Sequence, residues 1–175
     1  MATKKTIICY HWTGGTHKPN ATDLDSYQIL IGGMGEVYKG TNPNPSSIAG
    51  LNSITYNIAL CSMAGATESK CKKGNFGDYP ITRLQLEKAW YLGAVAMKEY
   101  KIPSSMIFTH SYIGQLFSEG KLCTTLNIKP NKWLVGNVSK WDIDYLKDYP
   151  SLDRKGILDL FRSKAQWYYN KKVNV

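Results

Sequence analysis

The sequence predicts a single-domain α/β protein in which one central mixed β-sheet is flanked by helices. The chain has 175 residues, which is enough for one sizeable hydrophobic core and too few for two comfortable ones. Its hydrophobic fraction of 43% and charged fraction of 20% are typical of a globular protein. Strand-like segments come first, one helical segment lies between strands, and another closes the chain, which is the order of a mixed α/β fold.

The first half of the chain is expected to supply most of the sheet. Lys4 to Trp12 is a short β-branched and apolar run that predicts a buried strand. Ser26 to Ile31 and Glu36 to Lys39 flank a glycine-rich turn, which predicts a hairpin. Ile54 to Met63 is a third strong strand, and the glycine- and lysine-rich residues 64–79 then predict a long surface loop.

A helix is expected after this loop, because the hydrophobic period changes there. Thr82 and Gln85 form a capping-box pattern. Apolar residues then recur at helical spacing from Leu86 to Tyr100. The helix is expected to stop near Pro103, since proline cannot continue it.

One more strand and one more helix complete the predicted fold. Ser105 to Thr109 predicts a short strand that ends on His110. Residues 114–138 contain several turn residues and are expected to be irregular. Asp153 to Tyr169 has one apolar face at helical spacing and predicts a closing helix.

The four cysteines do not predict a zinc knuckle, because none of them belongs to a CxxC pair. We expect small reduced thiols, buried or in loops. Cys71 lies in a polar stretch of the predicted surface loop and is the one expected to be exposed.

The net charge of +9 favours polyanionic partners, which include nucleic acid, anionic lipid and acidic cell-wall polymers. The apolar run from Thr6 to Tyr10 is too short for the core of a signal peptide. No apolar segment reaches the length needed to span a bilayer. We therefore expect the chain to be made in the cytoplasm and to stay there until it is released.

Two of the three histidines are candidate metal ligands. His11 and His110 stand at the ends of predicted strands, where the sheet holds a side chain that can face a cleft, whereas His17 is expected to be a surface residue. A catalytic zinc site needs three protein ligands and one open position. Asp142 and Asp144 are both available as the third ligand, and periodicity does not decide between them.

Several short pieces follow one another from Thr6 to Leu146, beginning with a strand that ends in a histidine and a small-residue loop. The pieces are His11-Trp12-Thr13-Gly14-Gly15, Tyr27-Gln28-Ile29-Leu30-Ile31, Gly35-Glu36-Val37-Tyr38, Asn57-Ile58-Ala59-Leu60, Thr109-His110-Ser111 and Lys140-Trp141-Asp142. In this order they resemble the zinc-dependent N-acetylmuramoyl-L-alanine amidases, the family of bacteriophage lysozyme-like amidases and peptidoglycan recognition proteins. The resemblance implies that family's α/β fold.

The resemblance also implies roles for individual residues. It makes His11, His110 and Asp142 the ligands of a Zn²⁺ ion, since the family's third ligand follows the lysine by two residues. It places the hydroxyl of Tyr27 near the zinc-bound water and gives Lys140 the stabilisation of the developing oxyanion.

Two departures from the family pattern bear on the mechanism. Some bacterial relatives carry a glutamate as general base on the central strand, where this chain has Ala59. The resemblance therefore favours a mechanism in which Tyr27 does the proton transfer. The long stretch between His110 and Asp142 is expected to be an insertion near the cleft.

The function that the resemblance implies is that of a phage-type endolysin. Such an enzyme cleaves the amide bond between N-acetylmuramic acid and L-alanine of bacterial peptidoglycan with zinc-activated water. It would be made in the host bacterial cytoplasm and would act on the cell wall after release. A non-catalytic peptidoglycan-binding protein of the same fold is one alternative. A nucleic-acid-binding protein is another, although no nucleic-acid-binding module is recognisable and no nucleic-acid partner is expected.

Residues 1–150 are assigned to the catalytic domain, and residues 151–175 to a basic amphipathic helix of the same domain. This last segment combines six basic residues with Trp167, Tyr168 and Tyr169. Such a helix can contact an anionic envelope surface. The oligomeric state is left open.

Overall fold

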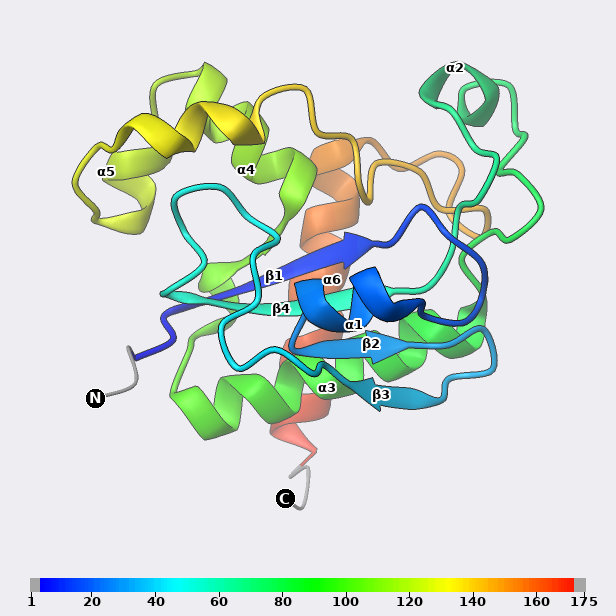
Figure 1. The fold of residues 1–175 in the computed structure, drawn as a ribbon, viewed down its shortest axis with the longest axis horizontal. Helices are drawn as coiled ribbons and strands as arrows, with labels where there is room; N and C mark the ends of the chain where they lie inside the picture. The colour runs from blue at the N-terminus through cyan, green and yellow to red at the C-terminus, as the bar shows by residue number, and fades with distance from the viewer. Residues whose placement is uncertain (1–3, 172–175) are drawn as a thin grey trace.

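A five-stranded sheet forms the centre of the protein in a computed structural model that describes residues 4–171 (Figure 1). The strands are β1 (Ile7–Trp12), β2 (Ile29–Ile31), β3 (Val37–Lys39), β4 (Thr55–Leu60) and β5 (Ile107–Thr109), in the order β3-β2-β4-β1-β5. β1 runs parallel to β4 and β5, β2 runs parallel to β4, and only β3 is antiparallel to its neighbour. The predicted mixed α/β fold is confirmed.

Helices cover both faces of this sheet. They are α1 (Ala21–Ser26), α2 (Glu68–Cys71), α3 (Arg83–Tyr100), α4 (His110–Ser118), α5 (Leu122–Leu126) and α6 (Arg154–Asn170), with 3₁₀ turns η1 (Ser104–Met106) and η2 (Lys132–Asn137). α3 and α6 lie together behind the sheet in Figure 1, and α1 lies in front of it. No helix in residues 4–171 is long and apolar enough to cross a membrane.

The alternation of side chains along β1 separates two parts of the core. Ile8 and Tyr10 belong to the cluster under α3 and α6. Ile7 and Cys9 belong to a second cluster with α4, α5 and η2. Since successive side chains of a strand point to opposite faces, His11 lies on the face of Cys9 and away from the α3–α6 core.

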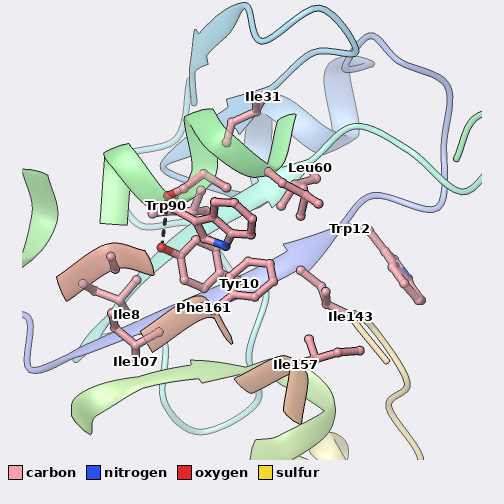
Figure 2. Close-up of a cluster of buried hydrophobic side chains, with 14 of the residues drawn as sticks. Ile8, Tyr10, Trp12, Ile31, Leu60, Trp90, Ile107, Ile143, Ile157 and Phe161 are labelled. Atoms are coloured by element: carbon pink, nitrogen blue, oxygen red, sulfur yellow. Dashed lines mark hydrogen bonds between the residues drawn. The ribbon is translucent and has the colours of Figure 1, made fainter. Parts of the chain in front are cut away.

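The core under α3 and α6 is built around aromatic side chains (Figure 2). The ring of Tyr10 packs edge-on against Phe161 of α6, with 4.7 Å between the ring centroids. The hydroxyl of Tyr10 donates a hydrogen bond of 3.0 Å to the carbonyl of Ala89 in α3. α3 can come this close because residue 93 is a glycine, and a Cβ there would overlap the Tyr10 hydroxyl.

Both predicted long helices are present, with the expected caps. The Thr82 side chain accepts from the Gln85 amide while the Gln85 side chain accepts from the Thr82 amide, which is the predicted capping box. α3 ends after Tyr100, and Lys101 then adopts a left-handed conformation with φ 56°. Asp153 caps α6 by accepting a 2.7 Å hydrogen bond from the Gly156 amide.

Three expectations about the loops are wrong. Residues 64–79 contain the short helix α2, whose last residue, Cys71, is buried in the α3–α6 core and not exposed. Residues 114–138 contain the end of α4, α5 and η2, because apolar side chains such as Leu116 and Leu134 pack together against the sheet. Tyr27 is not a strand residue, since it ends α1, a helix that hydrophobic periodicity did not indicate.

The cysteines that the structure describes are all free thiols. The basic residue Lys172, which was assigned to the closing helix, lies outside the described residues, as do residues 1–3 and 173–175.

Candidate metal centre

His11 and His110 come together because β1 and β5 are adjacent and parallel. His11 lies near the carboxyl end of β1, and His110 directly follows β5 as the first residue of α4. The carboxyl ends of parallel strands share one edge of the sheet, where ligand sites of open α/β sheets are found. The two imidazole rings are 4.8 Å apart between centroids.

Asp142 reaches the two histidines because its segment is held at three points. The amide of Ser111 in α4 donates a 3.0 Å hydrogen bond to the Asp142 carbonyl. On one side of Asp142, the Trp141 ring packs edge-on against Trp12, with 4.7 Å between centroids. On the other side, Asp144 accepts a 2.8 Å hydrogen bond from the Nε of Arg154.

The contacts of Asp142 and Asp144 show which of the two carboxylates faces the histidines. Both oxygens of Asp144 are bound by the guanidinium of Arg154, and its side chain does not join the histidines. Asp142 joins His11 and His110 in the one group of His, Cys, Asp or Glu side chains within residues 4–171 that has the spacing of a metal site. The geometry therefore favours Asp142 as the third ligand.

The carboxylate oxygen lies at separations from the two histidine nitrogens that suit a small tetrahedral metal ion. Oδ2 of Asp142 lies 3.2 Å from Nδ1 of His11 and 3.4 Å from Nδ1 of His110. With zinc–nitrogen and zinc–oxygen bonds of about 2.0–2.2 Å, neighbouring donors of a tetrahedral site are about 3.3 Å apart. Two imidazole nitrogens and one carboxylate oxygen are also a donor set that zinc accepts, and three protein ligands leave one position open.

Burial shapes the charge state of this cluster. Burial lowers the pKa of His11, so its imidazole is neutral at physiological pH. Burial alone would raise the pKa of Asp142, but its contacts with His11 and His110 outweigh that effect and hold its pKa well below the usual range. The cluster therefore offers a neutral imidazole and a carboxylate, the forms in which these groups bind metals.

Two buried asparagines stand behind the histidines, and sequence reasoning missed both. Nε2 of His11 lies 3.0 Å from Oδ1 of Asn57 in β4, and Nε2 of His110 lies 3.0 Å from Oδ1 of Asn137 in η2. An amide inside the otherwise apolar run of β4 was a usable signal for Asn57. Asn137 gave no comparable signal, because its neighbours Gly136 and Val138 are exposed and show no buried periodicity.

Tyr27 lies beside the cluster, as expected. Its ring centroid is 5.1 Å from that of His11. Burial and then the charge of Asp142 raise the pKa of Tyr27 well above its ordinary value, so the phenol stays protonated at neutral pH. It can therefore donate a proton or a hydrogen bond beside the candidate metal centre.

Comparison with known proteins identifies the family. A family model described as N-acetylmuramoyl-L-alanine amidase matches residues 2–132, which is most of the chain. The chain belongs to this family. It is therefore an N-acetylmuramoyl-L-alanine amidase, a hydrolase of peptidoglycan. The matched region contains His11 and His110, whereas Asp142 lies beyond its end.

Solved structures place the amidase among similar folds. AmpDh3 from Pseudomonas aeruginosa is 12% identical and has a TM-score of 0.52, with 100% of this chain and 94% of that chain covered. The N-acetylmuramoyl-L-alanine amidase LysC from Clostridium intestinale is 19% identical with a TM-score of 0.48, and the match covers 73% of this chain and 89% of LysC. The Drosophila peptidoglycan recognition protein SA is 20% identical with a TM-score of 0.42, and the match covers 62% of this chain and 68% of that protein. No functionally curated protein sequence matches the amidase significantly.

Lys140 is the other residue of this amidase for which a catalytic role was expected. Its side chain is exposed and lines a groove of about 390 Å³ together with Gly114, Trp141 and Arg154, among others. The lining of this groove does not include the three candidate ligands. The role of Lys140 in stabilising an oxyanion stays a prediction.

Two further positions clarify the proton chemistry. Ala59 pairs with His11 in the register of β1 and β4 and is fully buried, so no carboxylate occupies this position of the central strand. Nε2 of His17 lies 2.8 Å from the carbonyl oxygen of Pro80. Because a carbonyl oxygen can only accept, His17 donates this hydrogen bond. Its ring packs against Tyr79 and has a structural role in the loop after β1.

Proposed function

We propose that this amidase is a zinc-dependent, phage-type endolysin that cleaves the bond between N-acetylmuramic acid and L-alanine. The observation that carries the zinc proposal is the convergence of two histidine Nδ1 atoms on one carboxylate oxygen, at 3.2 and 3.4 Å. A zinc ion at this point would supply a nucleophilic water at neutral pH and polarise the scissile carbonyl.

The remaining steps fall to side chains around the cluster. Asp142 contributes the negative charge that balances a dication, and His11 and His110 contribute nitrogen donors. The protonated phenol of Tyr27 orients the attacking water or passes a proton to the leaving amine. Lys140 is proposed to swing from its exposed position towards the developing oxyanion when substrate fills the site.

The alternative expected from the sequence was a non-catalytic peptidoglycan-binding protein of the same fold. Peptidoglycan recognition proteins are among the similar structures. The intact His–His–Asp cluster favours the enzyme, because binding alone gives no reason to bury two histidines against a carboxylate.

The endolysin assignment is supported by the sequence from Lys140 to Asp144, which is similar to a form common in phage endolysins. The net charge of +9 suits an acidic cell wall. We propose that the basic helix contacts the envelope only through the end of α6, where Trp167 and Tyr169 are exposed. The same proposal has the enzyme made in the host cytoplasm and released to the wall.

Digestion of purified peptidoglycan tests the proposal. We expect mass spectrometry to find stem peptides with a free L-alanine amine and glycan strands that keep the lactyl carboxyl group. Chelation should abolish this activity, and stoichiometric zinc should restore it. Products cleaved in the glycan chain, or full activity without metal, would contradict the proposal.

Replacing Tyr27 with phenylalanine tests the proton-transfer role. The variant keeps the ring that packs beside His11 but lacks the hydroxyl. We expect kcat to fall by about 10²–10⁴-fold, the usual contribution of a positioned acid or base, while zinc content stays at one ion per chain. Unchanged kcat in the zinc-loaded variant would remove Tyr27 from the mechanism.

A further inference from the structure

The two candidate ligand histidines are each backed by a carboxamide, but the two carboxamides are held differently. Asn57 and Asn137 are both fully buried, and each places Oδ1 at 3.0 Å from the Nε2 of its histidine. Which nitrogen of a neutral imidazole carries the proton is set by the partner of the other nitrogen. The orientation of each amide therefore matters for metal binding.

The amide of Asn137 is fixed by backbone groups and not by the histidine. Its Nδ2 donates to the carbonyls of Ala49 and Leu134, at 2.8 and 3.0 Å. Its Oδ1 accepts from the amide of Ala49 at 3.2 Å. If the amide were reversed, its NH₂ group would face the N–H of Ala49, and its oxygen would face the carbonyls of Ala49 and Leu134. Only one orientation therefore satisfies the hydrogen bonds of this buried group.

Close packing between η2 and α4 keeps this amide beside His110. A Cβ at Gly114 would collide with the carbonyl oxygen of Asn137, so the glycine permits the approach. His110 stands four residues earlier in the same helix. The position of Asn137 relative to His110 is thus determined by backbone contacts on both sides.

Because Oδ1 of Asn137 is fixed beside Nε2 of His110, it determines the state of the other ring nitrogen, Nδ1. Nε2 faces an acceptor and must carry the proton, so Nδ1 of the neutral ring presents a lone pair. Oδ2 of Asp142, which is also an acceptor, lies 3.4 Å from this nitrogen. These two acceptors repel each other until a cation, either a proton or a metal ion, lies between them.

Asn57 lacks this constraint. Its Nδ2 is buried and has no hydrogen-bond partner within the described residues, so no other contact fixes which end of the amide faces His11. The orientation of the amide that faces the histidine is therefore fixed for His110 but not for His11.

We infer that Asn137 is a positioning residue that holds His110 as the Nε2–H tautomer and aims its Nδ1 at the metal. The inference rests on the proposed zinc site but concerns the protein before metal binds. Hydrogen-bond partners of this kind typically change metal affinity by about 10–100-fold.

NMR of the metal-free protein labelled with ¹⁵N-histidine tests the inference without activity. Above the titration range of the ring, we expect His110 to carry its proton on Nε2 in the wild type. We expect Asn137→Ala to show a mixture of tautomers. A His110 ring protonated on Nδ1 in the wild type would overturn the inference, and this result does not depend on whether any variant folds.

Zinc affinity, measured by competition with a chromophoric chelator, is the second readout. We expect the zinc Kd of Asn137→Ala to weaken by about 10–100-fold. Asn52→Ala is the matched control, because Asn52 braces the same loop through the amides of Ser47 and Ile48 but contacts no histidine. The control should keep the wild-type Kd. A folded Asn137→Ala with unchanged Kd would overturn the inference, whereas a wild type that binds no zinc would refute the proposed function and leave the tautomer result standing.

Discussion

Replacing Asp142 with asparagine is expected to remove the metal and abolish peptidoglycan cleavage. The carboxylate contributes the one negative ligand and the oxygen on which both histidine Nδ1 atoms converge. Loss of a direct ligand should weaken zinc binding by more than about 100-fold, since even groups that act through a ligand change affinity by about 10–100-fold. Metal analysis after dialysis and turnover of purified peptidoglycan would measure both effects.

The same substitution also affects stability, and the sign can be stated. Because the folded-state pKa of Asp142 is lowered, its carboxylate stabilises the folded protein above the unfolded-state pKa, and that contribution is lost as the pH falls through the folded-state pKa. Asparagine removes this contribution at neutral pH. Thermal unfolding must therefore accompany the metal measurement, so that an unfolded variant is not mistaken for one that lacks a ligand.

Asp144→Asn is the matched control for Asp142→Asn. It makes the same chemical change two residues away, at a carboxylate bound to Arg154. We expect it to lower the free energy of unfolding by about 1–3 kcal/mol, since a buried charge-assisted hydrogen bond is lost, and to keep one zinc per chain. Loss of zinc in Asp144→Asn, with zinc retained in Asp142→Asn, would reverse the assignment of the third ligand.

The sequence indicated two of the three candidate ligands for a physical reason. His11 and His110 each follow an apolar run, and the ends of neighbouring parallel strands meet at one edge of the sheet. The choice between Asp142 and Asp144 could not be made in this way. It depends on a turn at Ile143, where φ is 28°, and on contacts with residues distant in the chain.

The parts of the fold that were missed are short helices. α1, α2, α4 and α5 have six, four, nine and five residues, which is too short for a hydrophobic period to be recognised. Helices of this length are not stable alone and form because the rest of the protein packs against them. The long helices α3 and α6 were predictable because caps and period agreed over many turns.

The same dependence on packing makes Phe161 a sensitive position of the core. Its side chain is fully buried on α6 and contacts the rings of Tyr10 and Trp90, with centroids at 4.7 and 5.9 Å (Figure 2). Phe161→Ala is expected to lower the free energy of unfolding by about 3–5 kcal/mol, because a large cavity would remain between α3, α6 and β1. Urea denaturation would measure this loss.

Trp167→Ala on the same helix is the comparison that isolates burial from residue size. Trp167 is also a large aromatic residue, but 48% of it is exposed, and its ring contacts are with Tyr168 of α6 and with Lys171, which directly follows the helix. We expect its removal to cost less than about 1 kcal/mol, since an exposed contact of this kind contributes little. Equal losses for the two variants would contradict the conclusion that burial, and not residue size, makes Phe161 important for stability.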